Sequence, residues 1–281
     1  MTNKIIKVEN RKFIYCPSGK NIFDNSFCHK PTPFNLSDDI LRVYFGVRDD
    51  FGKTRTTFVD LDQKNPEKIL KISEDKCFED GKIGAFDDSG SNVCSVLKVE
   101  NEYYMYYIGW NPSTTVHTRN SIGIVFSDNG KNFFRRFDGS IVDRDKEEPY
   151  YTGAVDVMYE DGIFKMWYTS GSEWKIINNK PEIFYHIKYA ESDDGIDWNK
   201  KGIVCIPPIH NYEATARPSV FKHQNKYIML YSKRDLREFR HNKKFSYRAG
   251  IALSDDGISW TRKDESLDFS PSEQGWDDSA I

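Results

Sequence analysis

Residues 121–130 read SIGIVFSDNG, a strand that ends in a Ser-Asp-x-Gly turn, and this stretch decides the fold because it recurs. The same pattern returns at residues 187–198 (IKYAESDDGIDW) and 249–260 (AGIALSDDGISW). A unit that repeats at a period of roughly sixty residues is typical of a propeller or a solenoid. Each copy follows an aromatic run: 103–107 (YYMYY), 164–168 (FKMWY) and 227–231 (YIMLY).

The composition of each copy indicates strands and turns. Short runs of Tyr, Phe, Trp, Val and Ile are separated by Gly, Asn and Asp, which is the chemistry of strands and hairpins. The Asp-Gly and Asn-Gly pairs supply the positive φ angles that tight hairpins need. Since no stretch keeps apolar residues at helical spacing over several turns, the sequence predicts an all-β protein.

A weaker copy opens the chain, at residues 41–46 (LRVYFG) and 55–61 (RTTFVDL), and each copy has an earlier first strand. Packing such sheets radially around an axis leaves only short edges exposed. We therefore expect a β-propeller, a single domain over residues 1–281. Its blade units lie near residues 28–62, 92–136, 153–200 and 216–263.

The end of the chain predicts a fifth, incomplete blade. Residues 275–281 (GWDDSAI) read like the approach to a further first strand. A five-bladed propeller needs more strands to close, and residues 12–16 (KFIYC) are one source of them. A second copy of the chain in a homo-oligomer, covering the open edge, is the alternative.

Charge and composition exclude several classes of protein. The net charge is −3, from 40 basic and 43 acidic residues, which is no electrostatic footprint for nucleic acid. Five cysteines without a Cys-x-x-Cys pair fit a reduced protein better than a disulfide framework or a zinc site. No apolar run approaches the length of a membrane span, and no nucleotide-binding or zinc-protease motif occurs. We expect a cytoplasmic protein that uses no metal or cofactor and binds no membrane.

The strand–turn–aromatic pattern over residues 28–281 resembles the five-bladed β-propeller glycosidases, the group of glycoside hydrolase families 43, 32, 62, 68 and 130. Within that group it looks like proteins encoded among bacterial surface-polysaccharide genes. The resemblance implies a site at one end of the propeller axis with three carboxylates: a base or nucleophile, an orienting group and an acid. One carboxylic acid protonates the leaving oxygen, and one carboxylate attacks or activates water.

Two positions are compared with elements of family 43. Asp156 lies in GAVDV, which resembles the Ala-Pro-Asp-Val element that holds the orienting carboxylate in family 43. A lone Asp in an apolar strand is unfavourable unless it is paired or functional. Glu213 is the candidate acid, although it stands five residues before Pro218 where family 43 has two. A hydrogen-bonded axial Asp and a surface-loop Glu are the structural alternatives.

Asp87 and Asp88 precede the first strand of the blade before Asp156. Adjacent side chains point in different directions, so only one of the two is expected to face the axis. Asp88 is the candidate base, and Asp87 is a candidate for substrate binding. The alternative is an Asp-rich turn, which the Ser-Gly that follows also favours.

Basic and aromatic residues complete the predicted site. Lys30 stands where families of this group use an Asp as base, and Arg217 stands at the equivalent place in the fourth unit. With Arg48 and Arg248 they would suit an anionic or heavily hydroxylated sugar. Arg48 has an alternative in a turn that contains an ion pair. The side chains expected to contact the sugar directly are Trp110, Trp174 and His186. Trp198 and Trp260 repeat with the turns and are expected to be structural.

The leading functional hypothesis is therefore hydrolysis of a glycosidic bond in a bacterial saccharide. The first alternative is a non-hydrolytic sugar-binding or sugar-transfer protein of polysaccharide biosynthesis, whose ligand is a glycan or a nucleotide-sugar. Lys30 in place of an Asp and the displaced Glu213 motivate it. A phosphate-dependent glycoside phosphorylase and a protein-interaction scaffold are the remaining alternatives.

Overall fold

The computed structural model describes residues 6–17, 19 and 26–279, which form two compact units. The N-terminal unit runs from Lys12 to Asp143, and the C-terminal unit joins the residues up to Arg11 with those from Arg144 onward. Apart from two short 3-10 turns, η1 (Lys243–Phe245) and η2 (Asp264–Ser266), the regular structure of the described residues is β. Within those residues, no helix has the length and apolar character to cross a membrane.

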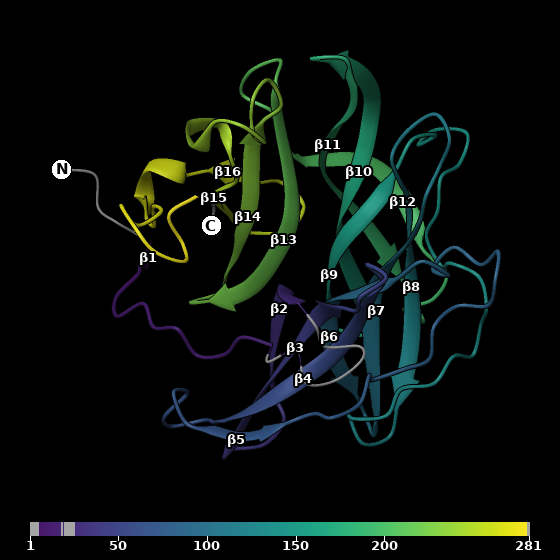
Figure 1. Cartoon of the computed structure of the whole chain (residues 1–281), viewed down its shortest axis with the longest axis vertical. Helices are drawn as coiled ribbons and strands as arrows, with labels where there is room; N and C mark the ends of the chain where they lie inside the picture. Colours follow the sequence, from purple (N-terminus) through teal and green to yellow (C-terminus); the bar gives the residue numbers. More distant parts are fainter. Residues whose placement is uncertain (1–5, 18, 20–25, 280–281) are drawn as a thin grey trace. The chain divides into compact units, whose positions relative to one another are not determined.

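The N-terminal unit contains two antiparallel sheets in which strands that follow one another in sequence lie side by side (Figure 1). Two bridges, Ile122 to Val142 and Phe126 to Phe134, extend the second sheet beyond its last strand. The first sheet is β2 (Ser26–Asn35), β3 (Ile40–Arg48), β4 (Thr54–Asp62) and β5 (Ile69–Ile72). The second is β6 (Ser91–Val99), β7 (Glu102–Asn111) and β8 (Arg119–Ser127).

The C-terminal unit repeats this plan in two four-stranded antiparallel sheets and adds one parallel pair (Figure 1). The first sheet is β9 (Thr152–Glu160), β10 (Ile163–Ile177), β11 (Lys180–Ser192) and β12 (Asn199–Ile206). The second is β13 (Glu213–His223), β14 (Lys226–Asp235), β15 (Arg248–Ser254) and β16 (Thr261–Arg262). The parallel pair is β1 (Ile6–Lys7) with β17 (Leu267–Asp268).

The strand pairings agree with the predicted order of the repeated units, since each unit forms one meander among the described residues. The closing segment differs from the expectation. Residues 12–16 contain no strand, and the N-terminal strand that does pair is β1, with Ile6 opposite Leu267. Residues 275–279 form turns and bends, and residues 280–281 lie outside the described part. The fifth blade stays a prediction.

The recurring turn is stabilised by its own side chains. In the last copy, the Ser254 hydroxyl accepts the Gly257 N–H at 2.8 Å, and Asp256 Oδ1 accepts the N–H groups of Ile258 and Ser259 at 2.7 Å each. Gly257 has a φ of +77°, which side-chain-bearing residues rarely adopt. Trp260 Nε1 donates to the Gly257 carbonyl at 3.0 Å, so this tryptophan has the structural part expected for it.

The aromatic runs join neighbouring sheets within each unit. The indole N–H of Trp167 donates to the carbonyl of Gly257 at 2.7 Å, from β10 to the turn after β15. The phenol of Tyr44, at the matching place in β3, donates to the carbonyl of Gly130 in the turn after β8. Buried apolar side chains fill the space around each contact. Around Trp167 these include Tyr189, Tyr227, Met229 and Ala252, and around Tyr44 they include Phe58, Val93, Met105 and Val125.

Candidate functional site

A pocket of about 400 Å³ opens on the C-terminal unit where β10, β11 and the loop before β13 meet. Aromatic rings alternate in its wall with hydroxyl, imidazole, amide and carboxylate groups. Such a mixture suits a sugar, which offers C–H faces to rings and hydroxyls to polar groups. The lining residues are Ser172, Glu173, Lys175, Phe184, Tyr185, His186, Pro208, His210, Asn211, Tyr212 and Glu213.

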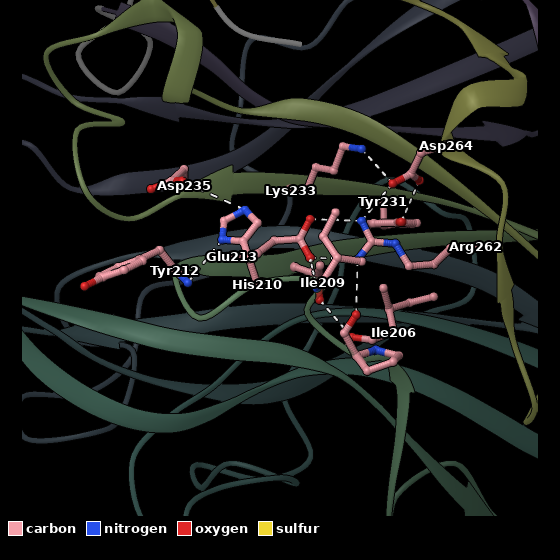
Figure 2. Close-up of polar contacts among 12 residues, drawn as sticks. Ile206, Ile209, His210, Tyr212, Glu213, Tyr231, Lys233, Asp235, Arg262 and Asp264 are labelled. Carbon is pink, nitrogen blue, oxygen red and sulfur yellow. Dashed lines mark hydrogen bonds and ion pairs between the residues drawn. The ribbon is translucent and has the colours of Figure 1, made fainter.

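Glu213 lines this pocket and is 5% exposed. Arg262 holds its carboxylate through two hydrogen bonds, Nη1 to Oε2 at 2.7 Å and Nη2 to Oε1 at 2.9 Å (Figure 2). The Ile209 N–H donates to Oε2 at 2.8 Å. Burial opposes the charged form, but these hydrogen bonds outweigh it and lower the pKa of Glu213. In this arrangement Glu213 is an ionised carboxylate, whereas a general acid must carry a proton.

Asp264 stands on the other side of Arg262 and accepts from its Nη2 at 2.7 Å (Figure 2). Lys233 Nζ and the Tyr231 hydroxyl donate to the same carboxylate at 2.6 and 2.7 Å. Burial opposes the charged form of Asp264, but these donors lower its pKa. Two carboxylates and two cations therefore form one network of buried and partly buried side chains that includes the pocket residue Glu213.

Two histidines line the pocket. His186 is half-buried in β11, and burial lowers its pKa with the help of the nearby Lys188 charge, against an opposite effect of Glu148. A neutral imidazole at pH 7 follows. His210 Nδ1 accepts the Tyr212 N–H at 3.2 Å, and its Nε2 lies 3.9 Å from an Asp235 carboxylate oxygen (Figure 2). The structure thus brings the predicted residues Glu213 and His186 into one pocket.

Three other predicted residues of the C-terminal unit, Trp174, Arg248 and Arg217, do not line this pocket. Trp174 packs against the buried cluster that contains Phe184, Tyr185 and Leu236, beside the pocket wall. Arg248 donates to the backbone carbonyls of residues 243, 247 and 279. Arg217 lines a different pocket, of about 230 Å³, near β1 and β17.

Asp156 lies on β9 and links two sheets. Its Oδ2 accepts the N–H of Val220 in β13 at 2.6 Å, and its Oδ1 accepts the N–H of Val157 at 3.1 Å. Asp156 is only partly buried, which leaves part of the side chain exposed. These hydrogen bonds are those expected if Asp156 has a structural role. Its catalytic role stays a prediction.

Asp87 and Asp88 belong to the N-terminal unit and point to different surroundings, as the sequence suggested. Asp87 is 1% exposed, and its Oδ2 lies 2.7 Å from Arg135 Nη2 and accepts from the Tyr107 hydroxyl at 2.9 Å. Asp88 stays at the turn, where it accepts from the Gly84 N–H at 3.0 Å and the Ser89 hydroxyl at 2.8 Å. The buried ion pair therefore belongs to Asp87, and the accessible carboxylate belongs to Asp88.

Lys30, Arg48 and Trp110 gather at one end of the two sheets of the N-terminal unit. Arg48 pairs with Thr54 across β3 and β4, and Thr54 forms a bridge to Gly90. A Cβ on Gly90 would lie 2.4 Å from the indole nitrogen of Trp110, so the absence of a side chain there admits the ring. Lys30 has a φ of +49° and Arg217 one of +50°, each directly before a proline and uncommon for residues with side chains.

A repeated ion-pair site was missed by sequence reasoning. Three buried carboxylates, each at or just before the first strand of its sheet, lie close to the last tyrosine of an aromatic run and to a cation. That cation stands eight residues after the turn serine in every copy, which is the sequence signal that would have found it. The sets are Asp87 with Tyr107 and Arg135, Glu148 with Tyr168 and Lys200, and Glu213 with Tyr231 and Arg262.

The repetition bears on function. Glu148 accepts from the Tyr168 hydroxyl at 3.0 Å and from Lys188 at 2.9 Å, and it is 4% exposed. A device that recurs in three sheets serves the sheets themselves, so the ion pairs of Asp87 and Glu213 have a structural explanation independent of catalysis. Across residues 6–17, 19 and 26–279, no group of three His, Cys, Asp or Glu side chains is placed to hold a metal ion.

Comparison with known proteins places these features in a family. Residues 94–276, well over half of the chain, match the family described as Glycosyl hydrolases family 32 N-terminal domain. The protein named Uncharacterized protein Rv1502, from Mycobacterium tuberculosis, is 32% identical over 271 residues, 95% of this chain and 86% of the relative.

Solved structures show the same fold. A structure described as a glycoside hydrolase superposes with a TM-score of 0.70 at 16% identity, over 99% of this chain and 82% of that protein. The Bombyx mori GH32 beta-fructofuranosidase BmSUC1 superposes with a TM-score of 0.55 at 15% identity, over 84% of this chain and 48% of that protein. The sheets therefore have the β-propeller arrangement of glycoside hydrolases, and the chain belongs to the family of glycosyl hydrolase family 32 N-terminal domains.

Proposed function

We propose that the protein acts on a glycosidic bond of a saccharide that binds in the pocket beside Glu213. The observation that carries the proposal is the pocket itself, whose wall combines the rings of Phe184 and Tyr185 with His186 and the Glu213 carboxylate. Family membership supports the reaction class, and the beta-fructofuranosidase among the similar structures suggests fructosides as first substrates to test.

The proposed roles follow the chemistry of each group. Asp156 is the orienting carboxylate, because two backbone N–H groups hold its side chain in a fixed position. The base predicted from the sequence, Asp88, is a separate candidate on the N-terminal unit, where its turn leaves it partly exposed. Glu213 contributes fixed negative charge near an oxocarbenium-like transition state instead of the proton expected from the sequence, since Arg262 keeps it ionised.

A second candidate function is saccharide binding without hydrolysis, and one observation favours it. Glu213 is held in a buried ion pair that lowers its pKa, whereas a general acid requires a raised one, and Asp87 is also held in a buried ion pair. A sugar-binding or sugar-transfer protein needs a pocket for the sugar, but it does not need a general acid that donates a proton to a leaving group.

One experiment separates the two functions. The purified chain is incubated with a panel of fructosides and other glycosides, with and without inorganic phosphate, and sugar release is measured beside equilibrium binding. Release that is lost in a His186→Ala variant supports glycosidase action, and release that requires phosphate assigns phosphorolysis. Saturable binding without release supports the second function. Release unaffected by His186→Ala would contradict the placement of the site.

The matched control is His223→Ala. His223 is exposed at the end of β13, outside the pocket, and its replacement is expected to leave binding and release unchanged. Circular dichroism of each variant confirms that the fold is retained.

A further inference from the structure

Arg48 is a partly buried cation with no ion pair among the described residues. Its guanidinium carbon lies 5.2 Å from the centre of the Phe27 ring, and its Nε is buried without a hydrogen-bond partner in the described part of the chain. The neighbouring acid does not neutralise it, because Asp49 pairs with Arg55. The turn therefore does contain an ion pair, but it joins Asp49 to Arg55 and does not involve Arg48. An unpaired, partly desolvated charge is costly unless a ligand compensates it.

His29 lies beside this cation. Its ring stacks on Phe27 with centroids 5.1 Å apart and planes at 23°, and it stands opposite Gly46 in the β2–β3 ladder. Its Nε2 is buried and finds no hydrogen-bond partner among the described residues. Burial, then the charges of Arg48 and Lys30, lower the pKa of His29 to about 4. The imidazole is therefore neutral at pH 7 and keeps one N–H to donate.

The neighbouring sheet adds two polar groups to the same place. A Cβ on Gly46 would lie 2.6 Å from Asn92 Oδ1, so the glycine lets the Asn92 side chain of β6 reach across to β3. Asn92 Oδ1 is buried without a partner in the described residues. The Trp110 indole reaches Gly90, which bridges to the strand partner of Arg48. The Trp110 indole carries one N–H donor, and the Asn92 amide carries its N–H donors on the nitrogen beside the oxygen that faces Gly46.

We infer that these five residues, Lys30, His29, Arg48, Asn92 and Trp110, form an anion-binding site that takes a phosphate group of a ligand. Arginine and lysine are the common partners of phosphate, and amide, indole and imidazole N–H groups complete a donor-rich surface. A phosphate monoester carries a charge of about −1.5 to −2 at pH 7. This charge balances the two cations, Lys30 and Arg48, more fully than the single negative charge of a carboxylate ligand would. The site lies within the N-terminal unit and shares no residue with the lining of the proposed glycosidase pocket.

The test is equilibrium binding to the full chain, measured by calorimetry with inorganic phosphate, fructose 6-phosphate and galacturonate as probes. We expect saturable binding of a phosphate probe that weakens as salt is raised. Arg48→Gln is expected to weaken it about tenfold or more, because hydrogen bonds to charged groups are lost. Tighter binding of fructose 6-phosphate assigns a sugar phosphate, and equal binding of inorganic phosphate assigns the free ion.

Two controls keep the inference falsifiable. Lys71→Gln removes an exposed charge from β5 of the same unit and is expected to leave binding unchanged. Arg48→Lys keeps the charge and is expected to retain part of the affinity. In the wild type, phosphate should raise the pKa of His29 in a histidine-labelled NMR titration. Absence of saturable phosphate binding by the folded protein, or equal affinity in Arg48→Gln, overturns the inference, whatever the outcome for glycoside turnover.

Discussion

Glu213 and Arg262 face each other through two parallel hydrogen bonds, with side chains that are 4% and 14% exposed. Paired bonds between a guanidinium and a carboxylate are among the stronger contacts in proteins. This one joins the start of β13 to β16, the two outer strands of one sheet. Glu213 therefore forms the wall of the pocket and also anchors the sheet that carries it.

Replacing Arg262 by methionine should destabilise the protein. The buried Glu213 and the partly buried Asp264 would both lose their shared cation, and such losses cost about 3–5 kcal/mol. Urea unfolding measures the change. Arg237→Met is the control, since Arg237 forms an exposed pair with Asp235 and should cost less than about 1 kcal/mol. Equal losses in the two variants would contradict the importance of the network.

Removing one phenol from a repeated ion-pair site should also cost stability. Tyr168→Phe deprives the buried Glu148 of its hydroxyl donor, which we expect to cost about 1–3 kcal/mol. Tyr159→Phe, at an exposed position of the preceding strand, should be close to neutral. Thermal unfolding of both variants gives the comparison. A neutral Tyr168→Phe would mean that Lys188 and Lys200 satisfy the carboxylate without the phenol.

Stability should fall as the solution is acidified below pH 5. Burial opposes the charge of Glu160, but hydrogen bonds from Lys165, Lys222 and Tyr227 lower its pKa to about 2. Because the folded pKa lies below that of the unfolded chain, this contribution is complete above about pH 4.5 and is lost as the pH approaches 2.

The measurement is the free energy of unfolding between pH 5 and pH 2. Glu160→Gln should show a shallower decrease than the wild type over this window. Glu273→Gln, which alters an exposed glutamate, should follow the wild-type curve. Parallel curves for Glu160→Gln and the wild type would show that Glu160 does not contribute.

Asp156→Asn tests the proposed catalytic role with little effect on folding. The amide keeps one oxygen that accepts the Val220 N–H, so the link between β9 and β13 persists, and only the local Val157 N–H loses its acceptor. Loss of the negative charge should abolish turnover of any glycoside that the wild type cleaves. Asp161→Asn, in an exposed hairpin turn, is the control. Normal turnover by Asp156→Asn would remove Asp156 from the mechanism.

Local patterns made the meanders predictable. Aromatic runs such as residues 164–168 and turns such as Ser254 to Gly257 fix strands and hairpins through contacts between residues near in sequence. The closing strand β1 was not predictable in this way, because two residues are too few to show a pattern. Residues 12–16 are more apolar, yet they form no strand.

The environment of the candidate residues depends on contacts that no local pattern reveals. Glu213 looks like a loop acid in the sequence, and only the fold shows that Arg262 holds it ionised. Asp87 and Asp88 are the same residue type and adjacent in sequence, but Asp87 is buried and Asp88 lies at a turn. Burial and pairing decide protonation, so the roles of these groups required the structure.

The pairing of β1 with β17 has a kinetic consequence. Each meander forms from strands that follow one another closely, whereas Ile6 must find Leu267 across almost the whole chain. Contacts between such distant residues carry the largest loop-closure entropy and form slowly. In hydrogen exchange, the amides of Ile6 and Lys7 should therefore be the last to gain protection during refolding, after those of β10 and β14.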